Sequence, residues 1–342
     1  MLAILAILAG GAVAGATGVA DIGGRLARGR PPWIFLAAGL ELVSVLGFVA
    51  IFQLAFGAWL PGRLTLRMGL AVRAATILVP AGGLVAIGLG ARALRRRGMP
   101  RAKTGPRAIA FLLITNAPNL IVLGILGIAL GAGLLDGPHA PILTVFPAAI
   151  ALSAIGLTAL LPIVSHQRAA RAPLWLPHRL AFAAARQLEL GVIEARALLA
   201  GRSWKLLGAV AYYAADNAVL WATFKAFGRT DPPIAIFAMA YLIGSAAGSL
   251  PVPAGIGVVD GGMIGTLVLY GAPATCAGVA VLAYRAVSNG LPLALGGIAF
   301  LRLCQQAPSQ SPTPGPSGTS RTLRRLAGDA LSKMATLPVP FP

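Results

Sequence analysis

The chain is poor in charge, and acidic residues are scarcest. Its 342 residues include only 9 Asp and Glu, and charged residues of both signs make up 11%, whereas soluble domains carry about 25%. Apolar residues make up 57%, and the mean hydropathy is +0.82. A soluble globular protein is therefore excluded, and the composition predicts an integral membrane protein.

Cysteine and histidine are also scarce. Cys276 and Cys304 form neither a disulfide framework nor a metal-ligand spacing, and the 3 histidines are scattered. No Gly-x4-Gly-Lys-Ser/Thr phosphate loop occurs. The net charge of +19 falls between apolar stretches, so it indicates loop charge that orients the chain in a membrane, not a nucleic-acid interface. We expect no metal, no cofactor and no catalytic residues.

Six apolar stretches are long enough to cross a bilayer, since a spanning helix needs about 20 residues. They are residues 2–20, 33–57, 108–134, 141–164, 206–228 and 274–301. Two further apolar regions, 62–97 and 232–271, are interrupted by Pro and Gly at Val79–Gly83 and Pro251–Gly255. We interpret each as a helix pair that breaks inside the membrane. The expected fold is an all-α polytopic membrane bundle.

The two ends of the chain and a basic internal segment complete the domain organisation. Residues 14–20 are small, as in secretory signals, but no Lys or Arg precedes Leu2, so we expect a retained helix; a misassigned start codon is the alternative. Basic and apolar residues mix at helical spacing over 165–205, which indicates either a helix on the cytoplasmic surface or a loop helix packed on the bundle. Residues 1–303 form the expected membrane domain and residues 304–342 a disordered cytoplasmic tail.

An internal repeat relates the two interrupted regions. Shifting the sequence by 173 residues aligns Val79–Gly82 with Val252–Gly255, and residues 74–125 match residues 247–298 at 16 of 52 positions. Composition this biased gives about five such matches by chance. Each copy comprises a broken helix pair followed by a full span.

Loop charge predicts that the two copies are inverted. The turn of the first copy carries six Lys and Arg between Arg95 and Arg107, whereas its counterpart Tyr270–Ala277 has none, and positive charge collects on the cytoplasmic side. Counting spans from this cytoplasmic turn places both termini in the cytoplasm. The loop 21–31, which carries three Arg, would then be external. Inverted repeats meeting at broken helices commonly place a transport site near the midplane. The alternative is that the repeat records only duplication and the breaks serve packing.

Polar residues inside apolar segments are the candidate site, because they are costly in hydrocarbon and usually face a cavity or a partner. Glu41 is one such acid, in the segment 33–57. Arg63 and Arg67 share a helix face that either collects phosphate oxygens or snorkels to the interface. The candidate substrate-binding residues are Arg63, Arg67, Arg73, Pro80, Gly82, Asn116, Asp216, Pro253, Gly255, Asp260, Arg285 and Asn289.

Two pairs among these residues have a structural alternative. Asp260 and Arg285 can meet as an ion pair that holds the second half-helix against the last span, with or without a role in transport. Asn116 and Asn289 occupy equivalent positions of the repeat, and they can bond between helices instead of to a ligand.

The stretch from Gly248 to Asp260, with Leu282-Ala283-Tyr284-Arg285 and Leu291-Pro292-Leu293 after it, resembles the lysylphosphatidylglycerol synthase transmembrane family of flippase-like proteins. That family includes the membrane half of bacterial multiple peptide resistance factors. The resemblance covers residues 1–303 and implies a helical bundle with two re-entrant elements that moves phospholipids or other lipid-linked polar molecules between leaflets. The residues that match its motif are Pro251, Pro253, Gly255, Gly257, Asp260 and Arg285. Many relatives carry an acid after the first break, whereas Gly83–Ile87 has none, so a two-acid mechanism is not supported.

Together these observations predict a flippase or lipid transporter of the bacterial plasma membrane. Arg63, Arg67 and Arg73 would attract an anionic phospholipid head group from the cytoplasmic leaflet, and Asp260 with Arg285 would line or brace the outer half. The alternative is a scaffold that transports nothing and docks a separately encoded lipid-modifying synthase or glycosyltransferase. An enzyme acting on lipid-linked substrate is disfavoured, because paired catalytic carboxylates with a nearby base are not evident. With 39 residues after Leu303, we expect no soluble aminoacyltransferase domain.

Overall fold

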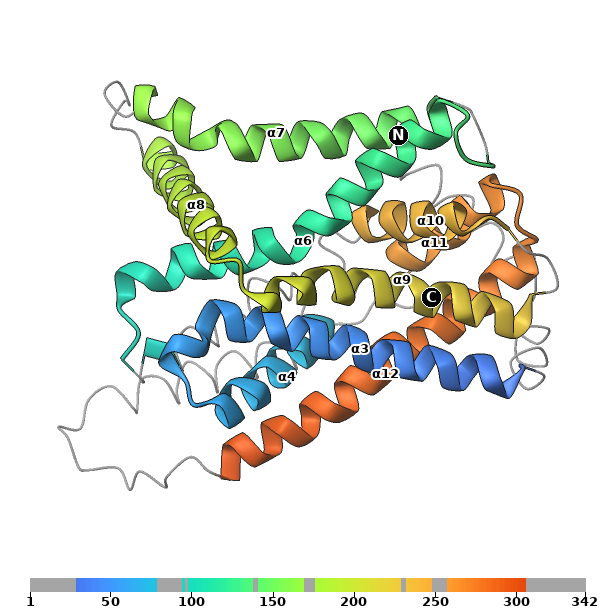
Figure 1. Cartoon of the computed structure of the whole chain (residues 1–342), viewed down its shortest axis with the longest axis horizontal. Coiled ribbons are helices and arrows are strands. Elements are labelled where there is room, and N and C mark those ends of the chain that lie inside the picture. Colours follow the sequence, from blue (N-terminus) through green and yellow to red (C-terminus); the bar gives the residue numbers. More distant parts are fainter. Residues whose placement is uncertain are drawn as a thin grey trace, which may run out of the picture. The chain divides into compact units, whose positions relative to one another are not determined.

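The computed structural model describes residues 29–78, 94–95, 98–137, 141–168, 176–228, 232–247 and 257–305, and within these ranges all regular structure is helical (Figure 1). The chain divides into a unit of residues 1–303 and a unit of residues 304–342, of which only residues 304 and 305 are described. The predicted segment 2–20, both Pro-Gly breaks and most of the tail lie outside the described residues.

The described helices follow the predicted apolar segments closely. Three of them are long and apolar enough to cross a membrane: α3 (Pro31–Phe56), α6 (Arg101–Gly131) and α12 (Ala274–Gln305). The predicted spans 141–164 and 206–228 correspond to α7 (Val145–Arg168) and α9 (Leu207–Phe227). The remaining helices are α4 (Gly62–Leu78), α8 (Leu176–Ala200), α10 (Ile234–Ala247), α11 (Val258–Leu269) and two short 3-10 helices, η1 (Gly57–Trp59) and η2 (Trp204–Leu206).

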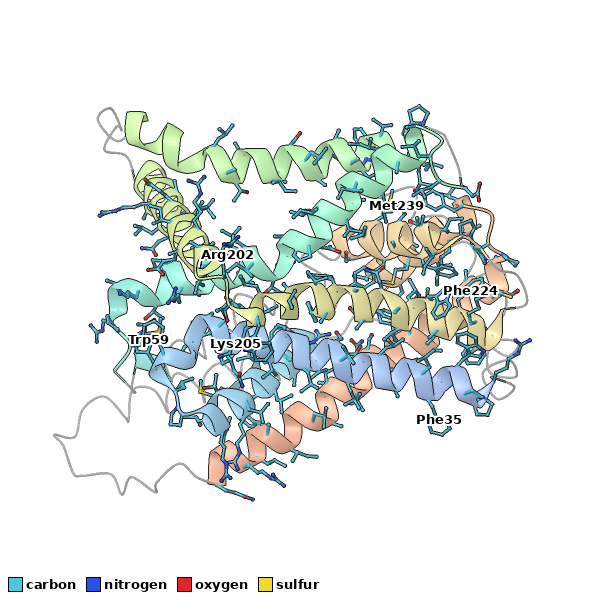
Figure 2. All side chains as sticks on the ribbon, viewed as in Figure 1. Phe35, Trp59, Arg202, Lys205, Phe224 and Met239 are labelled. Atoms are coloured by element: carbon cyan, nitrogen blue, oxygen red, sulfur yellow. The ribbon has the colours of Figure 1, made fainter. Side chains whose placement is uncertain are left out.

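Apolar side chains cover the outside of the bundle as well as its interior. Phe35 of α3 is 78% exposed, whereas Phe224 of α9 and Met239 of α10 are fully buried (Figure 2). A helix that is apolar all round suits a membrane span, because its outer face meets lipid.

Short helices flank the second predicted break. α10 has 14 residues and α11 has 12, so each is shorter than the roughly 20 residues of a full span. The two pack against each other, and Gly244 of α10 makes room for Met263 of α11. In the first copy, α4 ends at Leu78, directly before the corresponding break.

The two copies of the repeat share one turn in atomic detail. Gly98 has φ +95° and Gly271, which is 173 residues later, has φ +90°. The amide of Gly98 donates to the Arg95 carbonyl, and the amide of the next residue donates to Leu94. The same two bonds recur from Gly271 to Val268 and from the residue after it to Leu267. Both turns are thus Schellman C-caps, which need a residue with positive φ and so favour glycine, and each is followed by a long helix that begins directly after a proline.

The predicted basic segment forms the end of α7 and all of α8, which packs on the bundle. Gly191 of α8 lies against Ile109 of α6, and Arg107 of α6 forms an ion pair with Glu194 of α8 at 2.7 Å. Arg196 of α8 donates to the Ala159 carbonyl of α7 at 2.7 Å. These contacts match the bundle-packed alternative for this segment.

α3 and α9 make the most extensive helix contact and run antiparallel. The Arg30 amide, just before α3, donates to the Ala226 carbonyl of α9 at 3.1 Å. Further along, the helices approach at two glycines. A Cβ atom at Gly47 would lie 2.6 Å from the Gly208 carbonyl oxygen and 2.8 Å from the Tyr212 nitrogen. Small residues permit such close crossings in membranes, where van der Waals packing drives helix association.

We therefore expect Gly47→Ala to destabilise the protein by about 1–3 kcal/mol, because the new methyl group meets backbone atoms that cannot move aside. Gly39→Ala on the same helix is the matched control, since a Cβ atom added there would have no neighbouring atom within 4 Å, and it should be neutral or stabilise by up to about 1 kcal/mol. Unfolding in detergent micelles measures both. Equal stability of the two variants would show that α3 and α9 do not cross at this point.

Candidate functional site

A cavity of about 340 Å³ lies among seven helices of the bundle and carries many polar groups. Apolar side chains, including Phe48, Phe111 and Met263, form part of its wall. The polar groups come from α4, α6, α9, α10 and α12, and they are Arg73, Thr76, Thr115, Asn116, Tyr212, Tyr213, Tyr241, Ser245, Tyr284 and Arg285. A polar cavity inside such apolar helices is a candidate binding site, because buried polar groups are costly unless they are used.

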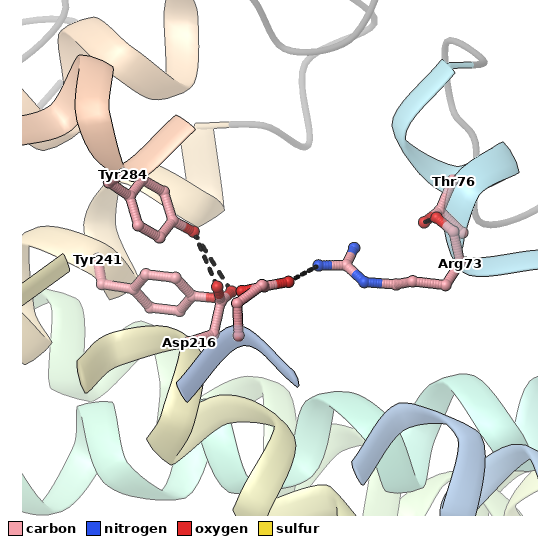
Figure 3. Close-up of polar contacts among 6 residues, drawn as sticks. Arg73, Thr76, Asp216, Tyr241 and Tyr284 are labelled. Carbon is pink, nitrogen blue, oxygen red and sulfur yellow. Dashed lines mark hydrogen bonds and ion pairs between the residues drawn. The ribbon is translucent and has the colours of Figure 1, made fainter. Parts of the chain in front are cut away.

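At the buried side of this cavity, one basic side chain meets two acidic ones (Figure 3). Arg73 Nη2 lies 3.9 Å from Glu41 Oε1. Glu41 is 0% exposed and Asp216 is 3% exposed. The Arg73 guanidinium also lies 5.3 Å from the centre of the Tyr212 ring, in the arrangement of a cation–π contact.

Two tyrosines hold Asp216 from different helices. The Tyr241 hydroxyl of α10 donates to Asp216 Oδ2 at 2.6 Å, and the Tyr284 hydroxyl of α12 lies 3.3 Å from both carboxyl oxygens (Figure 3). Hydrogen bonds to an ionised group are stronger than bonds between neutral groups, so this carboxyl group ties α9 to α10 and α12.

The crossing of α3 and α9 places the two acids side by side. Gly47 of α3 faces Gly208 of α9. Glu41 lies six residues before Gly47, and Asp216 lies eight residues after Gly208. Because the two helices are antiparallel, both acids are displaced from the crossing in the same direction. At about 1.5 Å per residue these displacements are similar, roughly 9 and 12 Å. Glu41 and Asp216 therefore lie at a similar level along the paired helices.

Several charged atoms at the cavity have no hydrogen-bond partner among the described residues. Within that part of the chain, both carboxyl oxygens of Glu41 lack a donor, and Nε of Arg73 and Nη2 of Arg285 lack an acceptor. Buried polar atoms are nearly always bonded in proteins. Arg73 and Arg285 both line the cavity, and guanidinium groups there suit an anionic or carbonyl oxygen of a ligand.

Arg285 is held in place by Asp260. The two side chains form an ion pair between α12 and α11, and Asp260 Oδ2 also accepts the Gly257 amide at 3.1 Å, at the start of α11. Gly257 has φ +83°, a conformation that glycine adopts without strain. The Asp260 carboxylate thus caps α11 and orients the arginine, which also lines the cavity.

The structure brings together some of the predicted site residues. Arg73, Asn116 and Arg285 line the cavity, and Asp216 and Asp260 hold groups that line it. Asn116 Oδ1 accepts a hydrogen bond from the Tyr213 hydroxyl at 2.8 Å, so it also links α6 to α9.

Other predicted residues lie elsewhere. Arg63 is exposed, and neither it nor Arg67 lines the cavity. Six residues separate Arg67 from Arg73, which at 3.6 residues per turn places them on different faces of α4. The predicted group of three arginines is therefore divided. Asn289 is half-buried on α12 and does not line the cavity. The predicted residues Pro80, Gly82, Pro253 and Gly255 lie outside the described residues.

The tyrosines at the cavity were missed as site residues from the sequence. The chain has 5 tyrosines, and Tyr212, Tyr213, Tyr241 and Tyr284 all line this one cavity. Tyrosine is scarce in the chain, and these four lie inside apolar segments. These two features could have indicated them as site residues. Glu41 was recognised as an acid within a span but was not placed in the site, because its partner Asp216 is 175 residues away in the chain.

Comparison with known proteins gives one family. The family model for the "Lysylphosphatidylglycerol synthase TM region" matches residues 1–296. No match to a curated protein was found.

We expect Arg73→Met to destabilise the protein by about 3–5 kcal/mol, because it leaves buried carboxyl groups without their counter-charge. Adding Glu41→Gln should recover part of that loss. Arg63→Met on the same helix is the control: this side chain is exposed, so the effect should stay within about 0.5 kcal/mol. Unfolding in micelles compares the three proteins. If Arg73→Met were as stable as Arg63→Met, the guanidinium would not neutralise the buried acids.

Proposed function

The chain belongs to the lysylphosphatidylglycerol synthase TM region family and is an integral membrane protein, and on this basis we propose that it is a lipid flippase or transporter. The polar head group of a phospholipid or lipid-linked molecule enters the cavity and passes between leaflets, while the acyl chains stay in the lipid phase. Family membership and the apolar helices support a membrane role, and the charged cavity supports passage of a polar group.

The observation that carries this proposal is that two arginines, Arg73 and Arg285, line one cavity among apolar helices. Arg73 Nε and Arg285 Nη2 are buried without a partner among the described residues, and both residues line the cavity. Guanidinium groups bind phosphate oxygens through charge-assisted hydrogen bonds. A volume of about 340 Å³ lies at the small end of the range for ligand pockets, so it fits a head group better than a whole lipid.

Arg63 and Arg67 would attract the head group before it reaches the cavity. They lie ten and six residues before Arg73 on α4, which places them roughly 15 and 9 Å from it along the helix axis. Cations at this spacing draw anionic lipids by long-range attraction. We place this end of α4 at the cytoplasmic face of a bacterial plasma membrane, with both termini in the cytoplasm.

The repeat supplies the proposed pathway. We infer that the copy containing α4 and α6 and the copy containing α10, α11 and α12 lie inverted in the membrane, each with a re-entrant helix pair. The matching turns at Gly98 and Gly271 support descent from one unit, and the difference in loop charge supports opposite orientation. In such folds the site lies where the copies meet, and no covalent step is required.

Reconstitution into liposomes tests the proposed function. Purified protein should accelerate the exchange of fluorescently labelled phosphatidylglycerol between leaflets, measured by quenching of the outer leaflet. Arg73→Lys keeps the charge but removes the Nε donor, so the rate should fall about tenfold or more, since a hydrogen bond to a charged group is worth about 1.5–3 kcal/mol. Arg63→Lys should retain at least a third of the rate.

Two results would count against the proposal. A purified, folded protein that moves no lipid but co-purifies with a lipid-modifying synthase would be a scaffold. Equal rates for Arg73→Lys and Arg63→Lys would remove the cavity from the transport path.

Cysteine labelling tests the inverted arrangement. Pro100 and Pro273 are equivalent in the repeat and both exposed, so Pro100→Cys and Pro273→Cys, each in a background without Cys276 and Cys304, report the two turns. An impermeant thiol reagent added outside intact cells should label Pro273→Cys and leave Pro100→Cys unlabelled until the cells are opened. Labelling of both from one side would show that the copies are parallel.

A further inference from the structure

The charges at the cavity do not balance when every carboxyl group is ionised. Arg285 and Asp260 neutralise each other as an ion pair. Arg73 then faces both Glu41 and Asp216, which leaves one excess negative charge. A net charge is costly inside a membrane protein, because it is far from water.

The geometry of the two acids fits a proton between them. Glu41 and Asp216 are both buried, and the crossing of α3 and α9 sets them at a similar level beside the one Arg73 guanidinium. Ionised carboxylates can only accept hydrogen bonds. A bond between them therefore requires a proton on one. Asp216 already accepts bonds from Tyr241 and Tyr284, whereas neither oxygen of Glu41 has an N–H or O–H donor among the described residues.

The neighbouring helices supply no other group, among the described residues, to absorb the charge. The α6 side chains at the cavity, Thr115 and Asn116, do not titrate. On α11, Asp260 is already paired with an arginine. The titratable and charged side chains that face the acid pair or the adjoining cavity are Arg73 from α4, Tyr212 and Tyr213 from α9, Tyr241 from α10, and Tyr284 and Arg285 from α12.

We propose that the Glu41–Asp216 pair carries one proton when the cavity is empty and takes up a second from water when an anionic head group binds at Arg73. This inference rests on the proposed function. The empty site then holds one cation and one carboxylate, and the loaded site holds one cation, one ligand anion and two carboxylic acids. Both states are neutral. The only covalent change is formation of one O–H bond on uptake, and its loss on release.

The arrangement makes transport of an anionic lipid electroneutral and coupled to one proton. Lipid and proton move together, so the lipid accumulates in the leaflet facing the more alkaline compartment. A zwitterionic head group brings no net charge and needs no second proton. The site should therefore couple phosphatidylglycerol movement to a pH gradient, but not phosphatidylcholine movement.

The experiment uses the full chain in phosphatidylcholine liposomes with a trace of labelled phosphatidylglycerol, and protein-free liposomes give the baseline. A gradient of one pH unit is imposed while potassium and valinomycin hold the membrane potential at zero. One proton per lipid predicts a change of about tenfold in the leaflet ratio. A membrane potential imposed at equal pH should leave the ratio unchanged.

A double variant separates the acid pair from the rest of the site. Glu41→Gln with Asp216→Asn removes both proton carriers and leaves Arg73 charged in the empty site. Its leaflet ratio should lose its response to pH and should respond to membrane potential. Glu194→Gln is the matched control, because this carboxyl group pairs with Arg107 between α6 and α8 and does not line the cavity; it should behave as the wild type.

The outcomes distinguish the two proposals. Lipid movement by the wild type that follows membrane potential, or that ignores the pH gradient, would overturn proton coupling and leave the proposed function standing. Absence of any lipid movement by folded wild-type protein would overturn both. The response of the wild-type leaflet ratio to a pH gradient and to a membrane potential tests proton coupling even where the double variant does not fold.

Discussion

The bundle depends on one arginine set against two buried acids. Arg73, Glu41 and Asp216 come from three different helices, and two tyrosines from α10 and α12 complete the contacts of Asp216. Buried charges are tolerated only when neighbouring groups compensate them. The helices must therefore converge at this point, and the convergence is also what surrounds the cavity with polar groups. One set of interactions thus accounts for both the packing of the interior and the position of the site.

The two halves of the repeat share backbone geometry but not chemistry. Their turns at Gly98 and Gly271 form the same hydrogen bonds, yet Tyr284 and Arg285 correspond to Phe111 and Leu112 when the 173-residue shift is applied. Asp260 likewise corresponds to an isoleucine, Ile87. At these three aligned positions the second copy has a polar or charged residue and the first an apolar one, whereas Arg73 precedes the aligned stretch 74–125. Glycine and proline were kept where the backbone requires them, and these polar side chains are found in one copy only.

Much of the helical framework was predictable, because runs of apolar residues ended by Gly, Pro or charge determine where membrane helices lie. The helix bounds of α3, α9 and α12 follow the predicted segments to within a few residues. The pairing of Asp260 with Arg285 was also accessible, since only 25 residues separate them. The partnership of Glu41 with Asp216 was not, because it depends on a crossing at Gly47 and Gly208 that composition does not reveal. Spacing along α4 grouped Arg73 with Arg63 and Arg67, whereas the turn of the helix separates them.

The central claim is that a lipid head group enters the cavity beside Arg73. Replacing Tyr213, which lines the cavity, with the photoreactive p-azidophenylalanine tests it directly in native membranes, with the same replacement at the outward-facing Ile128 as reference. Mass spectrometry of the illuminated protein should find lipid attached through its head group at position 213 and through its acyl chain at position 128. Attachment through acyl chains at both positions, or no lipid at position 213, would contradict the account.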